Sequence, residues 1–120
     1  MNSDAMKRRT KEFAKRIIEF CRTLPHNREG RLIGNQLFRS GTSAAANYRA
    51  ACRGRSRADF IAKLGIVEEE ADETLFWLEI IDEMAVDDTN VVQSLMQECD
   101  EIIAIMVLSI KTARQKKQFR

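Results

Sequence analysis

Hydroxyls, carboxylates and one histidine are the side chains of this sequence that could perform catalysis. Ser40 and Ser43 lie in a run of small and polar residues, but a nucleophilic serine needs a nearby base. The only histidine, His26, lies outside that run, beside Pro25. The carboxylates between positions 68 and 73 occupy neighbouring helical positions, which point to different faces. The sequence also lacks a Gly-rich phosphate loop and the Glu-x-x-His pairs of di-iron bundles, so we expect a non-enzymatic protein without a metal or cofactor.

Three cysteines, Cys21, Cys52 and Cys99, are widely spaced and form no Cys-x-x-Cys pair. An odd number at such spacings argues against a disulfide framework or a zinc site. We therefore expect reduced thiols and a cytoplasmic protein. The N-terminus shows no apolar signal segment, and the longest apolar run, 102–108, is far below the ~20 residues of a membrane span.

A stripe of polar residues is the most regular feature of the middle of the sequence. Gln36, Ser40, Ser43 and Asn47 recur at steps of four, three and four, which places them on one face of a helix. An apolar stripe lies beside it: Ile33, Leu37, Ala44, Tyr48 and Ala51. We expect this helix to bury a small and polar seam, whose side chains need hydrogen-bond partners.

Length and composition predict one all-α domain over residues 1–120, with one Pro and five Gly leaving little material for β-structure. Ser3 and Asn27 are the expected N-caps of the first two helices, and Ser56 with Asp59 resembles a capping box before the third. The predicted helices run from Asp4 to Leu24, from Arg28 to Arg53, from the Ser56 cap to Met84, and from Asn90 to Lys117. Short turns between four helices indicate an antiparallel up-and-down four-helix bundle.

Heptad spacing predicts the core-facing residues of the last two helices. In the third helix they are Phe60, Leu64, Val67, Ala71, Thr74, Leu78, Ile81 and Ala85, and in the fourth Val92, Met96, Cys99, Ile103, Met106, Ile110 and Ala113. Asp87, Asp88 and Thr89 form the expected turn and cap between them. Small residues around Gly41 favour close approach of a neighbouring helix.

The fourth helix carries more apolar residues than its seam uses. Leu95, Ile102, Ile105, Val107 and Leu108 project from its other faces. A helix that is apolar nearly all round is usually buried all round, which a single bundle does not achieve. Leu95, Ile102, Ile105 and Leu108 are therefore the predicted interface of a homo-oligomer. In the alternative interpretation they widen the core contact.

Up-and-down topology brings the start of the first helix, the second-to-third turn and the end of the fourth helix to one end of the bundle. Fourteen of the twenty Lys and Arg residues lie there, among them Lys7, Arg8, Arg9, Lys11 and Arg120. Acidic residues, including Glu79, Asp82, Glu83, Glu98 and Glu101, are expected at the far end. Such a basic pole is typical of phosphate binding. The predicted nucleic-acid contacts are Arg49, Arg53, Arg55, Arg57, Lys63, Lys111, Arg114, Lys116 and Lys117.

Two other interpretations of the basic residues stay open. Cations near helix C-termini also stabilise the helix dipole, and a basic end can bind an acidic protein or a sister subunit. Base stacking is weakly supported, since Tyr48 and Phe119 are the only aromatic candidates nearby. The alternative to nucleic-acid binding is a scaffold that captures a partner protein on its apolar or acidic helix faces.

The order Gln36, Arg39-Ser40, Ser43, Ala46-Asn47, then Phe60, Leu64 and Glu70 resembles a bacterial family of four-helix bundle proteins. That family is encoded in intervening sequences of large-subunit ribosomal RNA genes. The accessory variability proteins of diversity-generating retroelements are similar to it. The resemblance implies an up-and-down bundle, often a pentamer, without catalytic residues, and for the retroelement branch binding of nucleic acid and of a reverse transcriptase.

Overall fold

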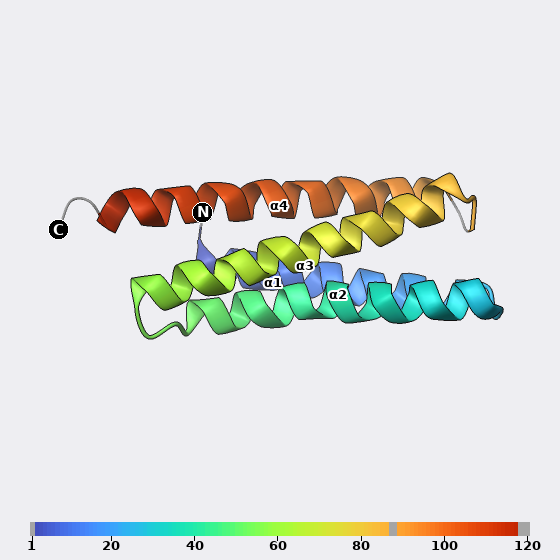
Figure 1. The fold of residues 1–120 in the computed structure, drawn as a ribbon, viewed down its shortest axis with the longest axis horizontal. Helices are drawn as coiled ribbons and strands as arrows, with labels where there is room; N and C mark the ends of the chain where they lie inside the picture. The colour runs from blue at the N-terminus through green and yellow to red at the C-terminus, as the bar shows by residue number, and fades with distance from the viewer. Residues whose placement is uncertain (1, 87–88, 118–120) are drawn as a thin grey trace.

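The chain folds into four helices joined by short turns, and the computed structural model describes residues 2–86 and 89–117. The helices are α1 (Ser3–Cys21), α2 (Arg28–Cys52), α3 (Arg57–Glu83) and α4 (Thr89–Lys117). Each runs antiparallel to the helix before it, in a body that measures 54 × 20 × 20 Å (Figure 1). The predicted all-α up-and-down bundle is confirmed. None of the helices over the described residues is long and apolar enough to cross a membrane.

Side-chain caps fix where the first two helices begin. At α1 the cap is Asn2 and not Ser3 as predicted, because Asn2 Oδ1 accepts hydrogen bonds from the Asp4 and Ala5 amides at 2.7 and 3.1 Å. At α2 the predicted cap is confirmed, with Asn27 Oδ1 accepting from the Gly30 amide at 2.8 Å. A Cβ at Gly30 would lie 1.9 Å from the Pro25 carbonyl oxygen, so this tight turn requires glycine.

The ends of two helices differ from the prediction. α1 stops at Cys21, three residues before Leu24, although Leu24 still packs into the core at 4% exposure. α3 stops at Glu83, and Ala85, predicted as a core position, is exposed with a left-handed φ of 52°. The heptad pattern runs past the true helix end because it carries no stop signal there. Asp87, Asp88 and the Thr89 side chain lie outside the described residues.

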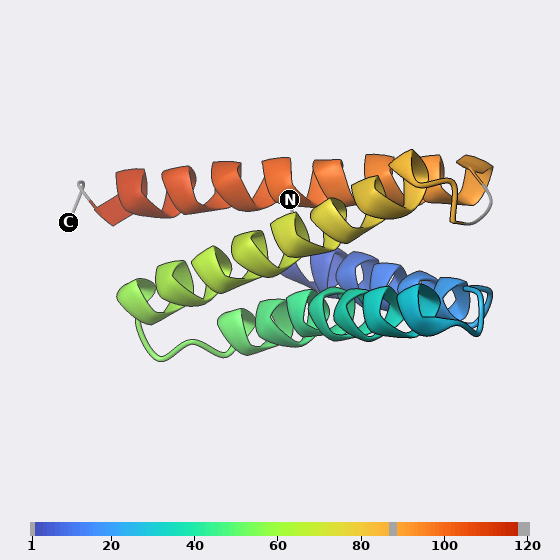
Figure 2. The same cartoon turned by 45° about the vertical axis from the view of Figure 1, so that its right-hand side comes forward.

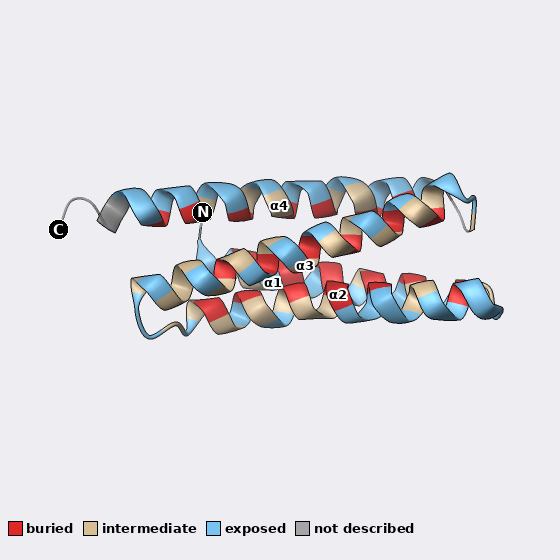
Figure 3. Ribbon diagram, viewed as in Figure 1, coloured by how far each residue is buried: buried red, intermediate tan, exposed pale blue. Residues whose placement is uncertain are grey.

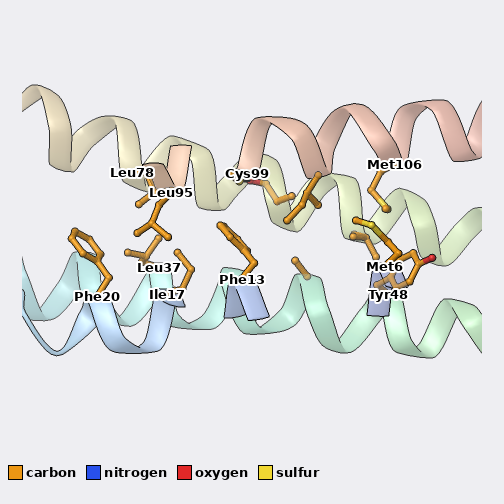
Figure 4. Packing of buried hydrophobic residues seen from close by; sticks show 14 of the residues in the cluster. Met6, Phe13, Ile17, Phe20, Leu37, Tyr48, Leu78, Leu95, Cys99 and Met106 are labelled. Atoms are coloured by element: carbon orange, nitrogen blue, oxygen red, sulfur yellow. Dashed lines mark hydrogen bonds between the residues drawn. The ribbon is translucent and has the colours of Figure 1, made fainter. Parts of the chain in front are cut away.

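One apolar core runs the length of the bundle (Figure 3). Figure 4 shows Phe13 and Ile17 of α1 meeting Leu37 of α2, Leu78 of α3 and side chains of α4. The α3 heptad is confirmed from Leu64 to Ile81, where every predicted position is buried. On α4 the seam is buried except for Met96 and Ile103, which are half-buried.

Two residues of the predicted oligomer interface belong to this core instead. Leu95 and Ile102 are each 1% exposed within the single chain. α4 packs against both α3 and α1, so it buries two neighbouring stripes and not one seam. Burial inside the chain leaves these two side chains unavailable to another subunit, and the core-widening interpretation holds for them.

The close approach expected at Gly41 is confirmed. A Cβ there would lie 3.0 Å from Ile17 Cγ2 of α1, which is tighter than an ordinary packing contact. Glycine at this buried position therefore lets α1 and α2 lie close together along their length. At the other side of the bundle the helices behave differently: α3 and α4 lie close at one end and separate toward the other (Figures 1 and 2).

Candidate functional site

The start of α1, the α2–α3 turn and the end of α4 lie at the same end of the bundle (Figure 1). This is the end at which the sequence places most of its cations, so the predicted convergence of basic segments is confirmed. The helices do not form one continuous surface at this end, however, because α4 diverges from α3 there (Figure 2). Basic residues line several separate hollows, among them one of about 430 Å³ between α1 and α4 that holds Arg8, Arg9 and Arg16 beside Glu12 and Glu98.

The first hollow, of about 500 Å³, lies between α1 and α2, and we call it the α1–α2 groove. Its lining residues are Asp4, Lys7, Arg8, Lys11, Ala45, Ala46, Arg49 and Arg53. Lys7 lies 3.2 Å from Asp4, the only carboxylate in the lining. Arg8, Lys11, Arg49 and Arg53 are exposed and have no carboxylate partner within the described part of the chain.

The second hollow, of about 320 Å³, lies between α3 and α4. Lys111 and Arg114 line it together with Glu68, Val107 and other residues of α4. Each of these two hollows has one carboxylate in its lining, but this one has two cations against five in the α1–α2 groove, so it is less positive. The side chains of Lys116 and Lys117, and all of Arg120, lie outside the described residues.

Three of the predicted nucleic-acid contacts, at the α2–α3 turn and the start of α3, differ in exposure and in ion pairing. Arg55 is exposed, whereas Arg57 is half-buried and its Nη1 has no hydrogen-bond partner among the described residues. Lys63 Nζ lies 2.8 Å from Asp59 Oδ2 on the next turn of α3. The hydrogen bond from Lys63 is the main cause of the lowered pKa of Asp59. Lys63 is therefore largely neutralised, in contrast with its predicted role as a free phosphate contact.

The capping box at the start of α3 differs in one hydrogen bond from the expected one. Ser56 Oγ accepts from the Asp59 amide at 3.0 Å, as predicted. In the reciprocal bond, Asp59 Oδ2 accepts from the Arg55 amide at 3.2 Å, one residue before the cap. The shorter Asp side chain in place of Glu thus ties the basic turn to the start of α3.

Arg9 does not belong to the open basic surface. Its guanidinium donates to Glu98 at 2.7 and 2.8 Å and to Glu101 at 2.7 Å. The hydrogen bond to Glu98 is the main cause of the raised pKa of Arg9. Glu98 and Glu101 were expected at the far end of the bundle, but they lie part-way along α4 and face α1. Two of the acidic residues thus neutralise a cation that the sequence assigned to the pole.

The polar seam of α2 is buried only in part. Ser40 is fully buried, and Thr74 of α3 places its Oγ1 2.8 Å from Ser40 Oγ. Asn47 donates to the Ser43 carbonyl at 2.9 Å and to Ser43 Oγ at 3.0 Å. Gln36 is exposed, which contradicts the expectation for that position. Within the seam, Ser40 thus makes the polar contact between α2 and α3, and heptad spacing marks its partner Thr74 only as a core position.

Buried thiols complete the interior chemistry. Burial raises the pKa of Cys99 to about 12, and its Sγ donates to the Ala71 carbonyl at 3.0 Å. Burial also raises the pKa of Cys21 to about 11 and that of Tyr48 to about 12. The three cysteines are free, as expected. Among the described residues no cluster of His, Cys, Asp and Glu could hold a metal ion.

Sequence reasoning placed Lys7, Arg8 and Lys11 at the correct end but did not select them as contacts. The signal was present, because Lys7 and Lys11, like Arg49 and Arg53, are four residues apart and share a helix face. What the sequence did not show is that these two faces lie opposite each other across one groove. Together, fold and site define a four-helix bundle with an open basic groove at one end.

Comparison with known proteins places the bundle in a family. The family model described as 23S rRNA-intervening sequence protein matches residues 4–107, and the chain belongs to this family. A similar solved structure is that of a protein of unknown function from the S23 ribosomal protein family of Bacteroides thetaiotaomicron. It is 35% identical with a TM-score of 0.85, and the match covers 92% of this chain and 99% of that chain. No curated protein was found to match the sequence.

Proposed function

We propose that this protein binds nucleic acid through its basic end and is not an enzyme. The observation that carries the proposal is that Arg8 and Lys11, in the first half of α1, are exposed and have no carboxylate partner among residues 2–86 and 89–117. The helix dipole explains Arg49 in the last turn of α2. The dipole offers no stabilisation to cations in the N-terminal half of a helix, so it does not explain Arg8 and Lys11. Phosphate binding gives them a role.

The names of the related proteins indicate which nucleic acid to test first, although the family name describes where its genes lie and not what the proteins bind. The family description refers to 23S rRNA and the solved relative to a ribosomal protein family, so RNA is the first ligand to test. The relative itself is of unknown function. An RNA ligand and free thiols fit the cytoplasm, where we propose that the protein acts.

A titration of fluorescently labelled RNA duplex tests the proposal. The observed affinity should fall linearly with the logarithm of salt concentration between about 50 and 200 mM, because bound cations release counterions from the phosphates. Anisotropy at each salt concentration gives the slope. Absence of binding at the lowest salt concentration would refute nucleic-acid binding.

We also propose that the protein is a homo-oligomer, with a pentamer favoured by the family resemblance. The remaining apolar surface of α4 supports this, since Leu108 is 63% and Val107 50% exposed and Ile105 is half-buried. Leu108→Glu should lower the mass measured by multi-angle light scattering, because it places a charge in an apolar contact. Asn35→Glu, at an exposed position of α2, a helix that does not pack against α4, is the control and should leave the mass unchanged.

The second candidate function is a scaffold that captures a protein partner. A further hollow between α3 and α4, of about 600 Å³ and separate from the one that holds Lys111 and Arg114, supports it. Acidic and apolar side chains line this hollow together, among them Glu79 and Asp100 beside Leu75 and Met96. Such a lining suits a basic, amphipathic helix of another protein. Substitutions in the α1–α2 groove would leave a scaffold of this kind unaffected, which separates the two functions.

A further inference from the structure

The α1–α2 groove combines charge with an unobstructed floor. Its two walls carry Lys7, Arg8 and Lys11 on α1 and Arg49 and Arg53 on α2, whereas Ala45 and Ala46 are the only other lining residues besides Asp4. Alanines project little, so a ligand can lie close to the backbone of α2. Carboxylate character is limited to Asp4, which lies 3.2 Å from Lys7.

The cations are spaced along the groove in two rows. Lys7 and Lys11 are one helical turn apart on α1, and Arg49 and Arg53 are one turn apart on α2. Four residues advance by about 6 Å along the helix axis. That advance is comparable with the separation of successive phosphates along one nucleic-acid strand. Because α1 and α2 are antiparallel neighbours, the two rows lie on opposite sides of the same track.

Nothing in the lining can stack on a base. Among the residues that the structure describes, no aromatic side chain lines the groove, and Tyr48, the nearest aromatic in the α2 sequence, is only 6% exposed. Proteins that bind single strands use aromatic platforms for the unstacked bases. A duplex keeps its bases inside and presents phosphates, which cationic side chains bind without reading the sequence.

We infer that the α1–α2 groove holds one phosphate backbone of a double-stranded nucleic acid, a proposal that rests on the proposed function. Cations of both walls contact phosphates of the same strand, and the groove reads charge and spacing rather than base identity. Duplex RNA and duplex DNA therefore both bind, and single strands bind more weakly. The α3–α4 hollow with Lys111 and Arg114 contributes less, because it offers only these two cations beside one carboxylate, Glu68.

Paired variants of the full chain test this inference in the same fluorescence titration. Lys11→Ala with Arg49→Ala removes one exposed cation from each wall. The expected loss is roughly tenfold in duplex affinity for each phosphate contact at about 0.1 M salt, and the salt slope falls by about one per cation. Arg28→Ala with Arg31→Ala is the matched control, since both arginines are exposed at the opposite end of α2. It should bind as the unaltered protein does.

Two further variants separate the possible failures. Arg49→Lys with Arg53→Lys should keep most of the affinity, because lysine also binds phosphate as a point charge. Lys111→Ala with Arg114→Ala should have a smaller effect than the groove variant. If the unaltered protein binds duplex but the α4 variant alone loses binding, the groove assignment is wrong and the proposed function stands. Tighter binding of an unstructured oligouridine than of duplex overturns the assignment to double strands, and absence of all binding overturns both proposals.

Discussion

Arg8 and Arg9 are neighbours in the sequence but belong to two different regions of the molecule. Arg8 lines the open α1–α2 groove and also, beside Arg9, a hollow between α1 and α4, but it has no ion-pair partner among the described residues. Arg9 points to α4 and pairs with Glu98 and Glu101. The comparison shows that the number of cations at one end of a bundle does not measure how many are free to bind a ligand.

The paired region extends across the middle of the bundle. Ion pairs join α1 to α4 and α2 to α3 there. We call the residues that form them the paired middle: Arg9, Glu98, Glu101, Arg39, Glu70 and Glu73. Trp77 Nε1 adds a hydrogen bond to Glu73 at 3.3 Å. These groups are satisfied inside the chain. The cations of the groove instead repel one another, a cost that only a bound anion removes.

The largest effect we expect concerns Cys99, which is fully buried in the core of the bundle. Cys99, with a pKa of about 12, is almost entirely a thiol near pH 8, whereas an unfolded cysteine is partly thiolate. In a chain with Cys21→Ser and Cys52→Ser, alkylation of Cys99 should be on the order of a thousandfold slower when folded than in urea. The rate should rise with pH up to the raised pKa. Mass spectrometry gives both rates, and equal rates would mean that the middle opens freely.

The next effect concerns the buried hydroxyl contact between α2 and α3. Thr74→Val removes one of two partners of Ser40 Oγ, which also donates to the Leu37 carbonyl at 3.3 Å, and should cost about 1 kcal/mol of unfolding free energy, the usual net worth of one hydrogen bond. Thr42→Val is the control, because Thr42 Oγ1 bonds only to carbonyls of its own helix. It should stay within about 0.5 kcal/mol. Urea unfolding followed by circular dichroism measures both, and duplex affinity should not change in either variant.

The adjacent arginines give the most direct test of the comparison. Arg8→Ala should weaken duplex binding about tenfold at 0.1 M salt, equivalent to about 1.4 kcal/mol, with little change in stability. Arg9→Ala should leave duplex affinity nearly unchanged and lower the free energy of unfolding. That loss should be about 1 kcal/mol or less, because the ion pairs of Arg9 are partly exposed. Each variant is measured by anisotropy titration and urea unfolding. Equal loss of affinity in both would erase the distinction between the two regions.

The smallest effect is a pH dependence within the paired middle. The hydrogen bond from Arg39 lowers the pKa of Glu73 below its ordinary value of 4.5. The pair therefore stabilises the fold above that pH, and the contribution is lost as the pH falls through the lowered pKa. Arg39→Gln should raise the midpoint of acid unfolding slightly. Arg31→Gln, an exposed cation of α2 without an ion-pair partner among the described residues, should leave the midpoint unchanged.

Local sequence signals predicted the elements well and their contacts less well. Asn27 and Ser56 marked helix starts correctly because capping depends on residues only three positions apart. Heptad spacing identified Leu64 to Ile81 for the same reason, since period and helix geometry are local. The prediction that Ala85 is a core position was wrong, because heptad spacing does not show where a helix ends. Leu95 and Ile102 were wrong because the width of a buried face depends on how many neighbours a helix has.

The sequence by itself determined four amphipathic helices, their turns, their antiparallel order and the end at which the cations gather, because each follows from nearest-neighbour chemistry and chain connectivity. Only the tertiary structure decided which cations are free. Arg9 meets Glu98 across 89 positions of sequence, while Arg8 turns to a groove whose other wall is α2. Rotation of a helix about its axis by one residue exchanges those environments, and packing against its neighbours fixes that rotation.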